Sequence, residues 1–487
     1  MNTIQKHYSS VLLGILVLLI STSCSDFLEE DPQNLVSTSN YYSTEQDAIA
    51  AVNSVYAYLG SYDASRGNTA GVYHSTFWIT QGLASDEMLN NQLGTPQYDQ
   101  LATFSHNADN AALLEIWQIH YKTISLANIA IDRIPLIDMD IDLQNRLVNE
   151  AKFLRGLLYF NMVRMFGEIP LVISEEAPLN PEAAAVPDIY DQIIRDLTDA
   201  ESLPDDGSIQ EGRATSGAAK GILAKVYLRL GEYQMAAAKA KEVIDSGQYD
   251  LWDNFDEAFD ISSRGGKEAV FSVGFGDGGG AISFWEVGQF NVRLLPAALS
   301  REVDGVSNTQ GWQIAVPDLY NTYEESDERK EATFMTSFIA SDGTLVNLDK
   351  IYIDKYWDRV ADPTAGGSFN DFPVLRYSDV LLTYAEAQAR LNNFSEANDY
   401  LNMVRERANL EEINASTMDE FIDIILSERR KEFVAEGMRW FDLTRLGRLE
   451  QAVQEAKNIS VGSQYYLFPI PQRERDVNPN LPQNQGY

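Results

Sequence analysis

A glycine run is the first motif in the chain whose residue types and spacing match a known chemical site. Residues 274–279 satisfy the pattern G-x-G-x-x-G and follow an apolar, strand-like piece. In dinucleotide-binding proteins such a run holds a pyrophosphate at the point where a strand leads into a helix. No clear helical pattern begins after this run. The run therefore indicates a glycine-rich turn and not a nucleotide site.

An aspartate triplet is the second such motif. Asp138, Asp140 and Asp142 begin like a calcium-binding loop. A loop of that type needs glycine at its sixth position and glutamate at its twelfth, and here Leu143 and Asn149 stand there. We expect Asp140 or Asp142 to cap the helix that follows, since a short carboxylate accepts hydrogen bonds from the free N–H groups of a first helical turn.

Other residues that could hold a metal or perform catalysis are few or scattered. The chain has one cysteine and four histidines, and His74, His106 and His120 show no metal-like spacing. The sequence therefore predicts no cofactor, no metal site and no catalytic residue. Paired carboxylates for glycoside hydrolysis stay open, because 72 acidic residues make chance pairs inevitable.

Tryptophans in polar segments are the side chains best suited to contact a ligand. Trp78 lies in a polar, loop-like region, Trp285 follows the glycine cluster, and Trp357 is the third such residue. An indole in a loop offers an apolar face for stacking. Trp312 is expected to be structural. The tryptophans that lie on helical stripes are expected in the core: Trp117, Trp252 and Trp440.

The charge of the chain excludes one broad class of partner. Its 487 residues include 37 basic and 72 acidic side chains, so the formal net charge is 37 − 72 = −35. This excess repels nucleic acid and anionic lipid headgroups. One run of mixed charge, residues 428–432, carries opposite charges three and four positions apart on a predicted helix. We expect it to form a structural ion-pair network and not a functional site.

The N-terminus predicts export and lipidation. A ten-residue apolar run, 11–20, precedes Ser21-Thr22-Ser23-Cys24, which is the order of a signal peptide over residues 1–23. Ten helical residues rise only about 15 Å, half of a bilayer core, so a permanent span is not expected. The segment resembles a bacterial lipobox, with Ser21 where leucine is usual. We expect Cys24, the only cysteine, to become the acylated mature N-terminus, and residues 24–40 to form the tether. The alternative is ordinary secretion with a free thiol.

Apolar periodicity predicts a mostly helical body. Between about 247 and 375 the periodicity weakens, and glycine clusters and short alternating pieces such as 269–273 indicate brief strands or ordered loops. Apolar residues recur at helical spacing in the following segments: 41–59, 111–134, 144–166, 187–203, 216–230, 232–246, 377–391, 395–408, 418–436 and 439–456.

Two of these helix pairs are related by an internal repeat. Residues 224–243 align with residues 385–404 at a constant offset of 161. In each copy small residues stand where the two helices would meet, an aromatic residue (Tyr233 or Phe394) follows the turn, and an alanine comes three residues later. This pattern is typical of tetratricopeptide helix pairs, which bury their apolar faces by stacking into a superhelix.

Several longer motifs make the chain similar to a known family. They spread, together with Cys24, over essentially the whole chain, and they resemble SusD/RagB lipoproteins. The motifs are residues 150–155 with Tyr159 and Phe160, 166–171, 375–387, 428–433 with Glu436 and Gly437, 439–443, 468–472 and 478–487.

The resemblance implies a fold. It predicts a mostly α, SusD-like domain over residues 41–487, in which tetratricopeptide-type helix pairs form a right-handed superhelical scaffold. We expect the scaffold at about 41–246 and 376–487. The loop-rich, ligand-facing insert with short strands is expected at about 247–375.

The resemblance also implies a function. It predicts a cell-surface lipoprotein of the outer membrane that captures a nutrient oligosaccharide and delivers it to a SusC-like TonB-dependent transporter. In the family the ligand usually binds on loops from the parts of the chain around Trp78 and Trp285, so these two are expected as stacking surfaces. The expected polar partners are Asp86, Asn90, Asn91, Tyr98, Asn291 and Arg293.

Three alternatives remain open on the sequence. A tetratricopeptide scaffold could bind protein partners on the periplasmic side of the membrane. A surface glycan hydrolase would turn over an oligosaccharide. A peptide could replace the glycan as the captured ligand. The sequence names neither the sugar nor its linkage.

The predicted anchor can be tested at one residue. Cys24→Ala is expected to release the protein from membranes or to block its processing, because it removes the thiol that would be acylated. Fractionation of cells followed by detection of the protein measures this. Unchanged membrane attachment of the variant would contradict the assignment of Cys24.

Overall fold

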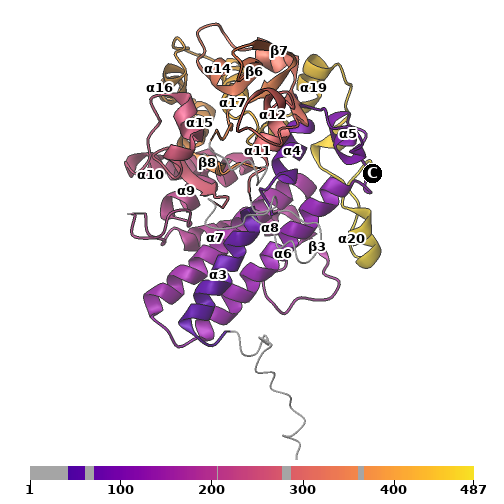
Figure 1. Cartoon of the computed structure of the whole chain (residues 1–487). Helices are drawn as coiled ribbons and strands as arrows, with labels where there is room; N and C mark the ends of the chain where they lie inside the picture. The colour runs from indigo at the N-terminus through magenta and orange to yellow at the C-terminus, as the bar shows by residue number, and fades with distance from the viewer. Residues whose placement is uncertain (1–41, 61–70, 206, 277–286, 360–366) are drawn as a thin grey trace, which may run out of the picture.

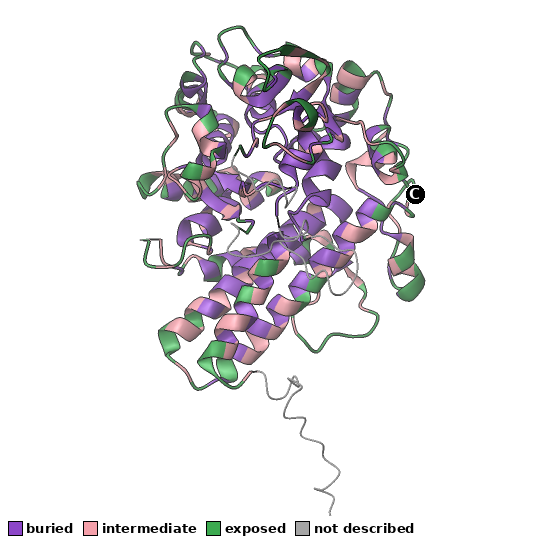
Figure 2. Ribbon diagram, in the orientation of Figure 1, coloured by how far each residue is buried: buried purple, intermediate pink, exposed green. Residues whose placement is uncertain are grey.

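The computed structural model describes residues 42–60, 71–205, 207–276, 287–359 and 367–487. Long helices lie side by side in one half of the molecule, and shorter helices, strands and loops make up the other half (Figure 1). Buried residues run through the centre, where the two halves meet (Figure 2). No helix in these residues is both long enough and apolar enough to cross a membrane.

The long-helix half is a bundle of four helices that pack on one another along their apolar stripes. Polar side chains define where two of them begin. Asn110 accepts hydrogen bonds from the backbone N–H groups of Ala112 and Leu113 at 3.1 and 3.3 Å. Asp140 accepts from the N–H of Leu143 at 2.9 Å, which confirms the predicted capping role. The four helices are α3 (Glu45–Gly60), α6 (Ala111–Arg133), α7 (Ile141–Phe166) and α8 (Val186–Ala200).

The internal repeat is confirmed in the geometry of two helical hairpins. The turn residues Gly231 and Asn392, which are 161 positions apart, both adopt left-handed backbone with φ of 78° and 65°. In the first copy the N–H of Glu232 donates to the carbonyl of Tyr227 at 2.9 Å, and the equivalent bond of the second copy has the same length. The hairpins pack against each other through α10 and α15. They consist of α9 (Ser216–Leu230) with α10 (Tyr233–Asp245), and α15 (Tyr377–Arg390) with α16 (Phe394–Arg407).

The strands of the described residues form two-stranded antiparallel pairs, most of them in the predicted loop-rich region. The predicted strand at 269–273 is confirmed as β4. The pairs are β1 (Met88–Asn90) with β5 (Gln313–Ala315), β2 (Ile169–Pro170) with β3 (Ala183–Ala184), β4 (Ala269–Val273) with β8 (Phe372–Arg376), and β6 (Phe334–Ile339) with β7 (Leu345–Ile353). Short helices lie among them: α11 (Phe290–Leu294), α12 (Leu299–Glu302), α13 (Pro317–Asn321) and α14 (Arg329–Thr333).

The structure corrects several predicted elements. The segment around Trp78, predicted to be a loop, contains the helices α4 (Thr76–Leu83) and α5 (Pro96–Ala102). Every residue of α4 is buried, so the helix has no polar face and no amphipathic periodicity. The predicted helix 439–456 is interrupted at Gly447, whose φ is 67°. It divides into α18 (Arg439–Arg445) and α19 (Leu449–Lys457), while α17 (Met418–Glu432) ends earlier than predicted and α20 (Gln472–Val477) is an additional short helix.

A network of buried ion pairs connects the scaffold to the insert. Glu432 at the end of α17 accepts from Arg329 at 3.0 Å, from Arg376 at 3.0 Å, and from Arg407. Burial alone would raise the pKa of Glu432, but these guanidiniums hold it well below its usual range. The structural role predicted for residues 428–432 is therefore confirmed. Its ion pairs run between elements inside the protein, however, instead of along one helix face.

Glu87 is the opposite case, a buried carboxyl without a partner. Its side chain is 0% exposed, and neither carboxyl oxygen has a hydrogen-bond partner within the described residues. Burial, reinforced by the neighbouring Asp86 carboxylate, raises the pKa of Glu87 to about 8. The fold therefore favours the protonated form of this side chain at neutral pH.

The repeat predicts equivalent effects of two substitutions. Ala236 in α10 and Ala397 in α16 are both 0% exposed at helix contacts. Replacing either with leucine is expected to overpack its contact and to lower the free energy of unfolding by about 1–3 kcal/mol. Urea denaturation measures the change. Ala238→Leu, at an exposed position of α10, is the matched control and should have little effect. Wild-type stability of both buried-site variants would contradict the equivalence of the two hairpins.

A second prediction concerns pH. The pKa of Glu87 is about 8 in the fold against its usual value of 4.5, so the folded protein keeps a proton that the unfolded chain releases. This carboxyl therefore costs stability progressively as the pH rises from about 4.5 to about 8. Glu87→Gln is expected to increase the free energy of unfolding by about 3 kcal/mol at pH 7, and to change it little at pH 4.

Urea denaturation at both pH values measures that difference. The exposed Glu412 offers the control substitution Glu412→Gln, which should not change the pH dependence. Equal stability of Glu87→Gln and the wild type at pH 7 would show that Glu87 is ionised in the fold.

Candidate functional site

The structure places Trp78 in the core. Its side chain is 0% exposed, and its ring stacks on Phe290 with centroids 5.4 Å apart and planes inclined by 25°. The prediction that Trp78 lies in an accessible loop is wrong, because α4 is surrounded by protein on all sides. The indole offers no face to a ligand.

Asp86 is a structural anion. Arg439 donates to both of its carboxylate oxygens at 2.7 and 2.8 Å, and Arg430 lies at 2.9 Å. Burial opposes ionisation, but the Arg439 and Arg430 guanidiniums lower the pKa of Asp86 to about 2. Both oxygens are therefore committed to protein cations, and the prediction that Asp86 is a polar partner of the ligand is wrong.

The side chain of Asn291 is also held by bonds within the protein. Only 6% of it is exposed. Its amide nitrogen donates to the carbonyl of Asp358 at 3.0 Å, and its amide oxygen accepts from the N–H of Asp358 at 3.1 Å. This closed pair of bonds joins α11 to residue 358 and holds the amide inside the protein, away from a ligand at the surface.

The other described candidates are brought together at one edge of the β1–β5 pair. Asn90 pairs with Gln313 across the two strands. The guanidinium of Arg293 lies 5.7 Å from the ring of Tyr98 and 5.2 Å from the ring of Trp312. We call this surface the β1–β5 patch; its residues are Asn90, Asn91, Tyr98, Arg293, Trp312 and Lys350.

Hydrogen bonds hold the asparagines of the β1–β5 patch. The amide of Asn91 donates to the carbonyl of Gly311 at 2.8 Å and accepts from Lys350 at 2.5 Å. The amide of Asn90 donates to Asp99 at 2.7 Å. These side chains are half-buried, so they are ordered by the protein and still reach its surface.

Arg293 keeps free hydrogen-bonding capacity in this patch. Its Nε and Nη1 are buried and have no hydrogen-bond partner in the part of the chain that the structure describes. The half-buried Trp312 lies beside them. The indole of Trp312 can stack on an apolar ligand face, and the exposed part of the half-buried Arg293 guanidinium beside it can donate to ligand oxygens.

Trp312 is the residue of this patch that sequence reasoning missed. It was expected to be structural, and nothing in its own segment distinguishes it from a core tryptophan. It reaches the patch because β5 pairs with β1, more than 200 positions earlier in the chain.

Some predicted residues lie outside the described residues. Trp285, the anchor Cys24, the signal peptide 1–23 and the tether 24–40 all belong to this group. The second half of the G-x-G-x-x-G run, residues 277–279, does so as well. Their predicted roles remain predictions.

The described residues hold no group of three or more histidine, cysteine, aspartate or glutamate side chains arranged to bind a metal. His74, His106 and His120 are all buried. Burial lowers the pKa of His106 and of His120 to about 4, and that of His74 to about 3. Each histidine is therefore neutral at physiological pH and is packed as an aromatic ring would be.

Known proteins resemble this chain along both its sequence and its fold. Residues 340–487 match a family model described as the SusD family, and residues 26–228 match one described as starch-binding associating with outer membrane. SusD-like protein P2 of Formosa agariphila is 29% identical, and the alignment covers 99% of this chain and 100% of that protein. The starch-binding protein SusD of Bacteroides thetaiotaomicron is 24% identical, with 99% of each chain covered.

A solved structure extends the likeness to three dimensions. It is a laminarin-binding SusD-like protein with 27% sequence identity and a TM-score of 0.77, covering 92% of this chain and 100% of the other. The fold, the two family models and the full-length relatives agree. The chain belongs to the SusD/RagB family, a family of outer-membrane-associated binding proteins and not of enzymes.

Proposed function

We propose that the protein binds an oligosaccharide at the β1–β5 patch and passes it intact to a SusC-like TonB-dependent transporter in the outer membrane. The observation that carries the proposal is the patch itself, in which Trp312 and Tyr98 flank a guanidinium with unpaired N–H groups. The similarity to a laminarin-binding SusD-like protein supports a glycan as the ligand.

The chemistry of a sugar suits this surface. A pyranose ring has an apolar C–H face, which stacks on an indole or phenol ring, and a rim of hydroxyls that need donors and acceptors. Trp312 would supply the stacking face, Arg293 and Lys350 would donate, and Asn90 and Asn91 would contact the rim. Trp285 remains proposed as a further stacking residue.

The proposed location follows from the N-terminus. Acylation of Cys24 would hold the globular body at the outer face of the outer membrane, on the tether of residues 24–40. Two or more acyl chains anchor a protein stably, whereas one gives only marginal binding. The net charge of −35 would keep the body away from anionic headgroups and leave the lipid as the membrane contact.

The ligand site can be tested with one tryptophan pair. Trp312→Ala is expected to weaken binding of laminarihexaose by roughly tenfold or more, because the stacking face is lost. Trp252→Ala is the matched control: Trp252 is also half-buried but contacts Lys267, away from the patch, and its loss should leave binding unchanged. Isothermal titration calorimetry with laminarihexaose and with maltohexaose measures both, and Trp285→Ala is titrated in parallel.

Sugar cleavage, thermal melting, ligand affinity and co-purification of a transporter test the proposal. The wild type should bind one of the two sugars and release it uncleaved, as chromatography of the incubated sugar would show. Trp312→Ala should melt close to the wild type. Wild-type affinity in Trp312→Ala would move the site away from the β1–β5 patch, and cleavage of the sugar would contradict a purely binding role. A β-barrel transporter that co-purifies from solubilised outer membranes would support the delivery step.

A further inference from the structure

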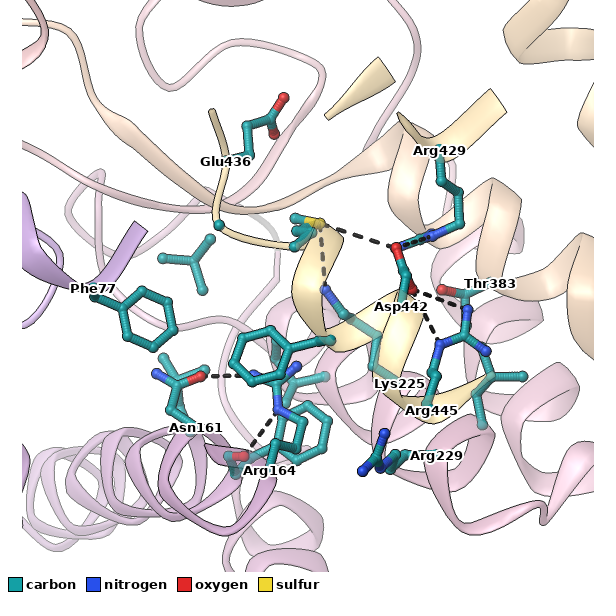
Figure 3. A pocket seen from close by; sticks show the side chains of 18 of the residues that line it. Phe77, Asn161, Arg164, Lys225, Arg229, Thr383, Arg429, Glu436, Asp442 and Arg445 are labelled. Carbon is teal, nitrogen blue, oxygen red and sulfur yellow. Dashed lines mark hydrogen bonds and ion pairs between the residues drawn. The ribbon is translucent and has the colours of Figure 1, made fainter. Parts of the chain in front are cut away.

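A cavity lies in the scaffold, on different residues from the β1–β5 patch. It has a volume of about 60 Å³ and is lined mainly by side chains from α7, α9, β8, α17 and α18 (Figure 3). Aromatic rings such as Phe160 and Phe441 make its apolar walls. Its cationic residues are Arg164, Lys225, Arg229, Arg429 and Arg445. We call it the arginine cavity.

Three of these cations are neutralised by carboxylates. Lys225 pairs with Asp379 at 2.5 Å, and Arg429 pairs with Asp379 at 2.6 Å and with Asp442 at 2.8 Å. Arg445 donates to both oxygens of Glu386 at 2.5 and 2.6 Å. Three cations therefore share three carboxylates. Glu436, which also lines the cavity, is bonded to Lys355 and Arg376.

Arg164 and Arg229 are the two cavity cations that are not paired with a carboxylate among the described residues. Neither has a carboxylate within 4.0 Å in the part of the chain that the structure describes. The two guanidiniums line the same cavity, and Figure 3 shows the Arg229 side chain without a bond to the other residues drawn. Among the described residues, a chain with 72 acidic side chains thus leaves two half-buried guanidiniums without a carboxylate partner, and the desolvated part of such a charge is costly.

The orientation of Arg164 is fixed by its neighbours. Its guanidinium carbon lies 3.8 Å from the ring centroid of Phe160 and 3.9 Å from that of Phe441, so the plane is held between two rings. Its Nε donates to the carbonyl of Phe160 at 2.9 Å and its Nη2 to Asn161 at 2.7 Å. Within the described residues, no hydrogen bond uses its Nη1 group. Burial lowers the pKa of Arg164 to about 10, so the side chain is still charged at neutral pH.

Arg229 adds a second free donor group. Its Nη1 is buried and has no hydrogen-bond partner in the described residues. Elsewhere its guanidinium is held by a hydrogen bond to the Tyr190 hydroxyl. N–H groups of this kind that lack acceptors are the groups that a bound oxyanion would satisfy, since planar N–H forks match carboxylate, sulfate and phosphate oxygens.

We propose that the arginine cavity binds a small oxyanion, a carboxylate, sulfate or phosphate group, between Arg164 and Arg229. The volume of about 60 Å³ is well below the roughly 150 Å³ that holds a benzene ring. The cavity therefore admits the oxyanion group and excludes a pyranose ring. The group arrives either as a free ion or as the acidic substituent of a sugar whose ring stays outside.

Anion titrations of the purified protein test this site. Sodium sulfate, sodium acetate and sodium glucuronate are each added at an ionic strength matched with sodium chloride, and the melting temperature is followed at pH 7. The wild type should show a saturable rise with at least one of them. Sulfate also stabilises proteins by exclusion from their surface, so only a saturable rise counts. A larger rise in melting temperature with glucuronate than with acetate indicates that the ligand is a sugar acid. Equal rises with the two salts indicate a free ion.

The matched variants are Arg229→Gln and Arg195→Gln. Each removes one positive charge, but Arg195 is exposed on α8 and only bonds Gln192. Arg229→Gln should weaken the anion affinity by roughly tenfold to a hundredfold, and Arg195→Gln should keep it. A saturable rise that survives in Arg229→Gln, or none in the wild type, would overturn the proposal.

A direct measurement keeps the proposal testable if Arg229→Gln is unstable. Crystals of the wild type soaked in selenate should show an anomalous selenium peak in the cavity, between the two guanidiniums. Absence of the peak at a concentration that saturates the melting shift would also overturn it.

Discussion

The buried carboxylate of Glu432 is the point on which the rest of the structure depends. It receives guanidiniums from the start of α14, the end of β8 and the end of α16. The three elements come together at this one carboxylate, and β8 and α16 share a second carboxylate, Glu268. An ion pair of this kind adds little net stability over an apolar contact of equal volume, but removing one partner costs about 3–5 kcal/mol because a charge is left unpaired. Its physical effect is therefore to permit one arrangement of the elements.

The network spreads from Glu432 to the neighbouring elements. Arg376 also reaches Glu268 and Glu436, and Glu436 in turn holds Lys355. From the same helix α17, Arg430 reaches Asp86, which is also bonded to Arg439. The segment that follows Asp86 is β1, so this bridge positions the strand that carries Asn90 and Asn91. The β1–β5 patch is thus built on a rigid interior, while its side chains other than the buried Tyr98 remain half-buried.

The same distribution of charge sets apart the residues of the two proposed sites. Basic side chains concentrate in the interior network, where each faces carboxylates, and the acidic excess remains elsewhere. Arg293 in the β1–β5 patch and Arg164 with Arg229 in the arginine cavity are the guanidiniums of interest because they depart from that rule. A cation kept inside without an acceptor has N–H groups that a ligand oxygen can satisfy.

The sequence by itself determined the helical scaffold, the repeat and the family. Helical periodicity and the offset of 161 are local properties, and each hairpin repeats the same turn, from Gly231 to its counterpart Asn392. Only the tertiary structure decided which candidates could meet a ligand. Trp78 and Asp86 looked accessible because their segment is polar, yet α4 is buried on every side and Asp86 is enclosed by arginines. Trp312 looked structural, and the pairing of β5 with the distant β1 placed it beside Arg293. Exposure depends on contacts between residues hundreds of positions apart, and no local pattern encodes those contacts.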